Sequence, residues 1–120
     1  VNKKDKAGRT PLHSAVRSAS DSALQLLLDD IRFDVNLRDR NGRTPLHVAV
    51  TEARDEVAVK MLLADPRVKV NLKDNKGWAP LHFATCEGLD NLVELLLGVK
   101  DIDVNLRDHE SKSPLLIAAI

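Results

Sequence analysis

Aromatic residues are almost absent from this chain of 120 residues, which holds two phenylalanines, one tryptophan and no tyrosine. A core without aromatic bulk has to be built from leucine, valine and alanine, which favours thin and regularly stacked layers. The same scarcity excludes a row of base-stacking aromatic side chains for single-stranded nucleic acid. No apolar run approaches the ~20 residues that a membrane span requires.

Cysteine and net charge are also scarce. The one cysteine, Cys86, excludes an internal disulfide framework and suits a reducing compartment, so we expect a cytoplasmic or nuclear protein. Eighteen basic and eighteen acidic residues cancel, so no overall field directs the chain towards nucleic acid or a membrane. The composition therefore indicates an intracellular, layered protein and leaves its function open.

Two markers recur along the chain in the same phase. A Pro-Leu pair begins at positions 11, 45, 80 and 114, with spacings of 34, 35 and 34 residues, and histidine follows it in the first three copies. A Val-Asn pair, with an aspartate three residues after the asparagine, keeps the same step at asparagines 2, 36, 71 and 105. Two markers in phase predict a tandem array.

Each unit reads as a helix, a turn, a second helix and a projecting loop. Thr-Pro starts the first helix, because a hydroxyl caps free amides and proline is tolerated at the first helical position. Leu12, Ala15 and Val16 then form an apolar stripe at i, i+3 and i+4. Asn-Gly or Lys-Gly before the next unit suits a tight turn with positive φ. Because no unit can bury its stripe alone, neighbouring units must stack.

With these motifs the chain resembles an ankyrin-repeat array, whose signature Thr-Pro-Leu-His-x-Ala stands at residues 10–15 and 44–49. The resemblance implies an all-α solenoid of about three and a half helix-turn-helix units, with β-turn hairpins, or fingertips, on one edge. We expect a single array over residues 1–120, as a window from a longer one. It is divided into the end of a preceding repeat (1–4), repeats at 5–38, 39–73 and 74–107, and a partial repeat at 108–120.

The second unit is one residue longer than its neighbours. Comparison of the intervals puts the additional residue between Ala53 and Ala58, which predicts a longer inter-helix loop around Arg54 and Asp55. The fourth unit has a serine where the turn glycine belongs and a leucine where the histidine belongs.

Residues with catalytic or metal-binding chemistry do not assemble into a site. His13, His47 and His82 recur one repeat apart, about 8–10 Å in stacked helices, whereas zinc ligands converge within about 2.1 Å of one ion. The resemblance instead implies a structural hydrogen-bonding role for these histidines. The Cys86 thiol has no activating partner in phase, and the recurring aspartates, such as Asp39, are interpreted as shaping the turns. We predict no enzyme activity, no metal and no cofactor.

The asparagine of each Val-Asn pair has two interpretations. It satisfies the hairpin backbone, which we take as the reason for the residue. Alternatively, the resemblance implies hydroxylation, because a leucine eight residues earlier is similar to the context in which an oxygenase modifies ankyrin asparagines in animals. The candidates are Asn36, Asn71 and Asn105.

Charge is separated within this neutral chain. The fingertip segments 3–9, 37–43, 72–78 and 106–112 hold eleven basic and five acidic residues, a net charge of +6, and the remainder carries −6. The edge is either simply solvated or recognises an acidic segment through steering and arginine–carboxylate pairs. Trp78 stands where the first two units carry arginine, and both residue types dominate interface energetics; the alternative is that Trp78 packs within the array.

We therefore predict a monomeric, non-catalytic scaffold module that binds an acidic or extended segment of a partner protein, with no small-molecule substrate and no membrane insertion. Nucleic-acid binding by the basic edge and a purely structural spacer in a multidomain protein are the alternatives. The resemblance implies contacts at the turns and at the exposed ends of the inner helices. These residues are Arg9, Arg17, Arg40, Arg43, Thr51, Glu52, Asn75, Lys76, Trp78, Cys86, Glu87, His109 and Lys112.

Overall fold

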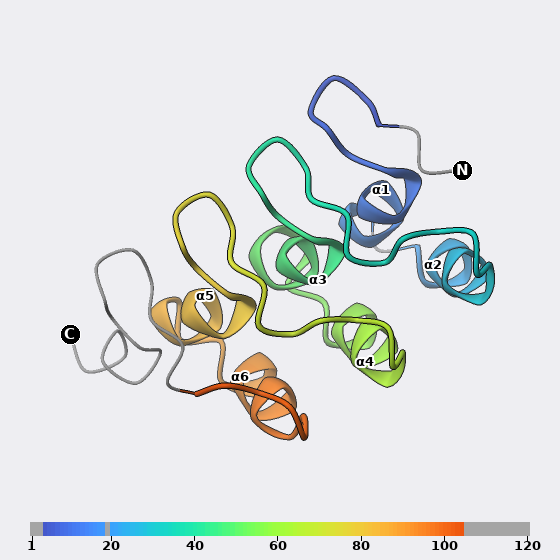
Figure 1. The fold of residues 1–120 in the computed structure, drawn as a ribbon. Helices are drawn as coiled ribbons and strands as arrows, with labels where there is room; N and C mark the ends of the chain where they lie inside the picture. Colours follow the sequence, from blue (N-terminus) through green and yellow to red (C-terminus); the bar gives the residue numbers. More distant parts are fainter. Residues whose placement is uncertain (1–3, 19, 105–120) are drawn as a thin grey trace.

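The computed structural model describes residues 4–18 and 20–104, and these form stacked helix pairs with a hairpin loop projecting from each unit (Figure 1). The inner helices form one row and the outer helices a second, so that α1 packs on α3 and α2 packs on α4. The inner row consists of α1 (Pro11–Arg17), α3 (Pro45–Val48) with the π-helix η1 (Ala49–Ala53), and α5 (Pro80–Cys86). The outer row consists of α2 (Asp21–Asp29), α4 (Glu56–Ala64) and α6 (Asp90–Leu97). The all-α array that the repeats predicted is confirmed for these units.

The Thr-Pro-Leu-His motif builds the start of each inner helix. The Thr44 hydroxyl accepts the N–H of His47 at 3.3 Å, and Nδ1 of His47 accepts the N–H of Thr44 at 3.1 Å. Thr10 and His13 repeat this reciprocal cap in the first unit. The cap satisfies two amides that would otherwise lack partners at a helix start. The prediction that each Thr-Pro begins a helix is thus confirmed.

The second ring nitrogen of these histidines joins neighbouring units. Nε2 of His13 donates to the carbonyl oxygen of Arg43, and Nε2 of His47 donates to that of Trp78, each at 2.8 Å. A backbone carbonyl only accepts and a backbone N–H only donates, so both rings are neutral and protonated at Nε2. The structural role expected for the histidines is confirmed at these two positions.

Small aliphatic side chains fill the space between the two helix rows. The apolar stripes expected from the sequence are the side chains that become buried, and Leu46, in the central unit, is 1% exposed. The large members of this core are Leu12, Val16, Leu24, Val50, Val59, Leu62, Leu81 and Leu96. The described aromatic residues are only partly buried, as expected for a core made of thin aliphatic layers.

Each hairpin turn is shaped by its aspartate. Oδ1 of Asp39 accepts the N–H of Asn41 at 2.8 Å and that of Arg43 at 3.0 Å. Asp5 and Asp74 accept the corresponding amides in their own units. The interpretation of these aspartates as turn-forming residues is confirmed.

Main-chain hydrogen bonds connect the hairpins to one another. The N–H of Arg40 donates to the carbonyl of Ala7 at 2.9 Å, and the N–H of Asn75 donates to that of Asn41 at 3.0 Å. The hairpins therefore stand side by side as one continuous fingertip edge, which we define by residues 4–9, 37–43 and 72–78 (Figure 1).

The additional residue of the second unit lies inside its inner helix. The N–H of Arg54 donates to the carbonyl of Ala49, five residues earlier, which closes a wide π-type turn over Ala49–Ala53. Arg54 then adopts a left-handed conformation (φ 48°) two residues before α4, as Gly88 (φ 64°) does before α6. The predicted longer loop at Arg54 and Asp55 is wrong, because intervals between apolar markers do not reveal where a helix widens.

Substitution of Leu46 tests the position of the core. We expect Leu46→Ala to lower the free energy of unfolding by about 2–5 kcal/mol, because a fully buried side chain is removed. Lys6→Ala removes an exposed side chain and should change it by less than about 0.5 kcal/mol. Urea denaturation followed by circular dichroism measures both values, and equal losses would contradict the assigned core.

Two glycines test the contact between hairpins. Gly42 and Gly88 both have positive φ, so alanine at either costs about 1 kcal/mol from the backbone alone. Only at Gly42 does an added Cβ meet a neighbour, the amide nitrogen of Asn75 at 2.8 Å; nothing lies within 4 Å at Gly88. Gly42→Ala should therefore be more destabilising by about 1 kcal/mol or more in urea denaturation. Equal effects would mean that the hairpins do not touch.

Acid should loosen the array through its histidines. Burial lowers the pKa of His13 and His47 below the usual 6.5, and the carbonyl partners oppose this only in part. Below about pH 6.5 the unfolded chain binds protons that the folded chain excludes, so this stability is complete above that pH and is lost as the pH falls. Urea denaturation at pH 7.5 and 5.5 should show lower stability at pH 5.5. His47→Gln should reduce that difference, and an unchanged difference would contradict the assignment.

Candidate functional site

Arg9 and Arg43, both expected to contact a partner, are engaged within the array. Nε of Arg9 lies 3.5 Å from Oδ2 of Asp39, and these side chains are 11% and 1% exposed. Nε of Arg43 lies 3.8 Å from Oδ2 of Asp74. The arginine of one unit therefore balances the turn aspartate of the next, and a partner carboxylate would compete with an existing ion pair.

Glu52 balances charge between the first two units. Its carboxylate accepts a hydrogen bond from Nη2 of Arg9 and lies 3.5 Å from Nε of Arg17. The Arg17 side chain remains 65% exposed, whereas that of Glu52 is 27% exposed. The inner-helix face, which we define by the exposed ends of α1, η1 and α5, therefore has mixed rather than basic charge.

A cation and two aromatic rings meet between the second and third units. Nη2 of Arg54 lies 3.8 Å from Oε2 of Glu87, and its guanidinium carbon is 5.9 Å from the centroid of the Phe83 ring. Trp78 packs edge-on against Phe83 and nearly parallel to His82, both on α5 of its own unit, with centroids 6.3 Å away. Trp78 is half-buried, so it supports its own helix and still offers ring surface. Sequence reasoning missed Arg54 and Phe83 as a pair because no motif links them.

The remaining predicted residues have different surroundings. Oγ1 of Thr51 is buried and has no hydrogen-bond partner in the described part of the chain, whereas Cys86 is exposed at the end of α5. The amide Nδ2 of Asn75 donates to the carbonyl of Arg40 at 2.9 Å, and Lys76 is exposed. His109 and Lys112 lie outside the described residues.

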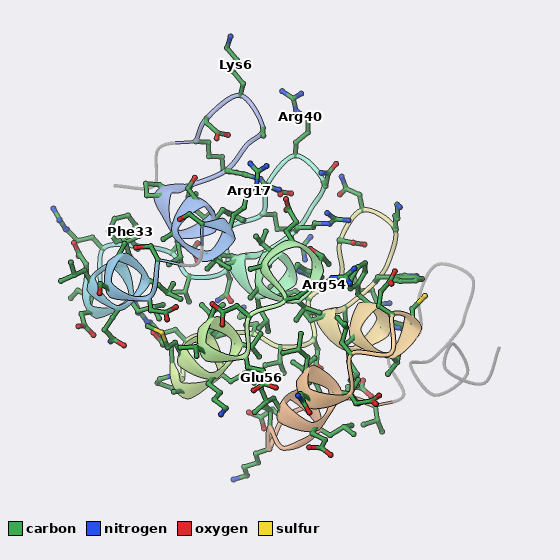
Figure 2. The ribbon with its side chains drawn as sticks, turned by 180° about the vertical axis from the view of Figure 1, so that it is seen from behind. Lys6, Arg17, Phe33, Arg40, Arg54 and Glu56 are labelled. Carbon is green, nitrogen blue, oxygen red and sulfur yellow. The ribbon has the colours of Figure 1, made fainter. Side chains whose placement is uncertain are left out.

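Pairs of cations flank the turn aspartates, and sequence reasoning had included only part of them. Lysine or arginine precedes the aspartate in each described unit, and a second cation follows it one or two residues later. Figure 2 shows Lys6 and Arg40 extending outwards from the tips of successive hairpins. The cation pairs are Lys4 with Lys6, Arg38 with Arg40, and Lys73 with Lys76.

Among the residues that the structure describes, none of these flanking side chains pairs with a carboxylate. Over residues 4–18 and 20–104 they form no ion pair; Lys4 and Arg40 only donate to carbonyl oxygens of the adjacent hairpin, those of Arg38 and Lys6. An ammonium has three N–H donors and a guanidinium five, so most remain available. The sequence signal that would have revealed them is the basic residue that stands directly before the turn aspartate in each described unit.

The candidate hydroxylation sites link neighbouring units. Nδ2 of Asn36 donates to the carbonyl of Arg67 at 2.8 Å, and its Oδ1 accepts the N–H of Lys69 at 2.9 Å. Asn71 makes the same two bonds one unit further on. A structural role is confirmed for these two residues, but the backbone groups that they satisfy lie in the loop after the next outer helix and not in the hairpin itself. Hydroxylation stays a prediction, and Asn105 lies outside the described residues.

No three histidine, cysteine or acidic side chains lie close enough to hold a metal ion in the described part of the chain. None of the described helices has the length and apolarity to cross a bilayer.

Comparison with known protein families gives a match over most of the sequence. A family model described as ankyrin repeats (3 copies) matches residues 1–74 and, in a second alignment, residues 31–108. Such repeats generally mediate protein–protein interaction, and the family is typically non-enzymatic. A search of curated proteins finds none that matches this sequence.

Proposed function

The chain belongs to the ankyrin-repeat family, and we propose that it is a module that binds an acidic or extended segment of a partner protein. The binding surface is the fingertip edge together with the inner-helix face. One observation carries this proposal: the partly buried Arg9 and Arg43 are already paired with aspartates, whereas the flanking cations form no ion pair within residues 4–18 and 20–104.

Exposed cations on a rigid edge suit the capture of an acidic segment. Their field raises the rate of encounter with an anionic partner and disfavours cationic ones. Because main-chain hydrogen bonds hold the hairpins together, the edge loses little conformational entropy when a ligand binds. Rigidity and charge therefore favour the same surface.

The inner-helix face adds contacts of another kind. Trp78, Phe83 and Arg54 form a half-exposed cluster of the residue types that contribute most at interfaces. Glu52 and Glu87 keep this face mixed in sign. A partner segment that leaves the edge would thus meet apolar and stacking contacts here.

The proposal is tested by reversing two charges at the fingertip edge, with a matched control variant in which two charges are reversed elsewhere. We expect Lys6→Glu with Arg38→Glu to weaken partner binding at least about tenfold, because two unpaired cations become anions. Lys60→Glu with Lys69→Glu makes the same change at exposed positions outside the edge and should have little effect. Affinity capture with each variant as bait, read by mass spectrometry after circular dichroism confirms folding, compares them.

The outcomes separate the alternatives. Partners with acidic segments that are lost only from the edge variant support the proposal. If both variants lose the same partners to the same extent, the net charge of the chain alone determines binding, and the proposal is contradicted. Captured nucleic acid whose affinity falls linearly with log salt, about 0.9 per phosphate contact on duplex DNA, would favour the nucleic-acid alternative. Full capture by the edge variant would contradict a role of the fingertips and move the binding surface to another face of the array. If neither the unchanged chain nor the variants capture a specific partner, the spacer is the alternative that is left.

A further inference from the structure

We propose that the fingertip edge recognises an acidic segment in polyproline II conformation that carries a carboxylate at every third residue. Each carboxylate is held between the two flanking cations of one hairpin, which we call a cation clamp. This inference rests on the proposed function and adds the conformation and the charge spacing of the partner.

The clamps recur once per unit because each is built around a turn aspartate. The Asp39 carboxylate points into its own turn, where it accepts two amides, and its side chain is 1% exposed. Arg38 and Arg40 on either side are exposed. The carboxylate of the protein is thus withdrawn and neutralised by Arg9, and two cations are presented to solvent in its place.

The spacing between clamps is fixed by the array. Main-chain bonds from Arg40 to Ala7 and from Asn75 to Asn41 hold adjacent hairpins together. The Lys4 ammonium adds a bond of 3.1 Å to the carbonyl of Arg38 in the next hairpin. Stacked repeats of packed helices lie about 8–10 Å apart. The distance between the carboxylates of a ligand must therefore match the distance between successive clamps.

A polyproline II segment meets this spacing on one face. It rises 3.1 Å per residue with three residues per turn, so equivalent side chains recur every ~9.3 Å on the same side. A β-strand returns to the same face after two residues, about 6.8 Å, which falls between clamps. An α-helix returns only after seven residues, about 10.5 Å, and its cylinder of ~10–12 Å offers one carboxylate per two turns. The extended, three-residue period fits best.

Charge selects a peptide of this spacing over one with clustered acids. A block of adjacent glutamates engages one clamp at a time and leaves the others unpaired. Glutamates at every third position pair with successive clamps without any change in the array. The gain arises from several simultaneous contacts along one rigid ligand, which is an effect of valency.

Two peptides of identical composition test the inference with the full 120-residue chain. One consists of four Glu-Pro-Pro triplets and the other of four glutamates followed by eight prolines, each with a fluorescent label. We expect the triplet peptide to bind at least about tenfold more tightly in fluorescence anisotropy at low salt, because only it reaches successive clamps. Lys6→Glu with Arg38→Glu should abolish that preference, while Lys60→Glu with Lys69→Glu should preserve it.

Each other result overturns a defined part of the proposal. Equal affinity for both peptides, lost in the edge variant, would remove the three-residue spacing and leave the acidic-segment function standing. Binding that the edge variant does not alter would overturn both. Tighter binding of a helical peptide with glutamate at every seventh position would replace the polyproline II conformation. Tighter binding of an oligothymidylate of equal charge, sensitive to the edge variant, would replace the carboxylate ligand by phosphate.

Discussion

The hydrogen bond from a buried histidine to a carbonyl of the next hairpin is the contact on which the rest of this structure depends. Nε2 of His13 reaches the next unit, while Nδ1 of the same ring caps its own helix. One side chain thus sets the start of an inner helix and the position of the adjacent hairpin. Because the ring must stay neutral to do both, the order of the fingertip edge depends on the exclusion of a proton from the core.

The turn aspartates determine which charged side chains of the hairpins face solvent. Asp39 uses one carboxylate oxygen to shape its own turn and faces Arg9 of the preceding unit with the other. The pairing withdraws a carboxylate and an arginine from the surface together. What remains outward is a set of flanking cations, such as Lys6 and Arg40 (Figure 2). The surface offered to a partner is therefore a consequence of how the turns are held, and this links the stacking of the repeats to their proposed function.

The accuracy of the sequence-based predictions depended on the range of each interaction. The Thr-Pro caps and the turn aspartates act within four residues, so the motif itself predicts them, and they are confirmed. The wide turn in η1 was missed because several backbone paths satisfy the same interval between apolar markers. The pairing of Arg43 with Asp74 joins residues 31 positions apart in adjacent hairpins, and repeat phase alone does not say which side chains turn inwards.

The sequence by itself determined the period, the helix starts, the turns and the aliphatic character of the core, because these follow from local backbone chemistry and from side-chain spacing along one helix. Only the tertiary structure decided which charged side chains form ion pairs inside the array and which face solvent. The physical reason is that an arginine in a hairpin has the same local sequence whether its guanidinium lies against a neighbouring carboxylate or in water. Arg9 and Lys6 stand three residues apart in one turn, yet Arg9 pairs with Asp39 of the next unit whereas Lys6 is exposed. Stacking of the next unit decides this difference.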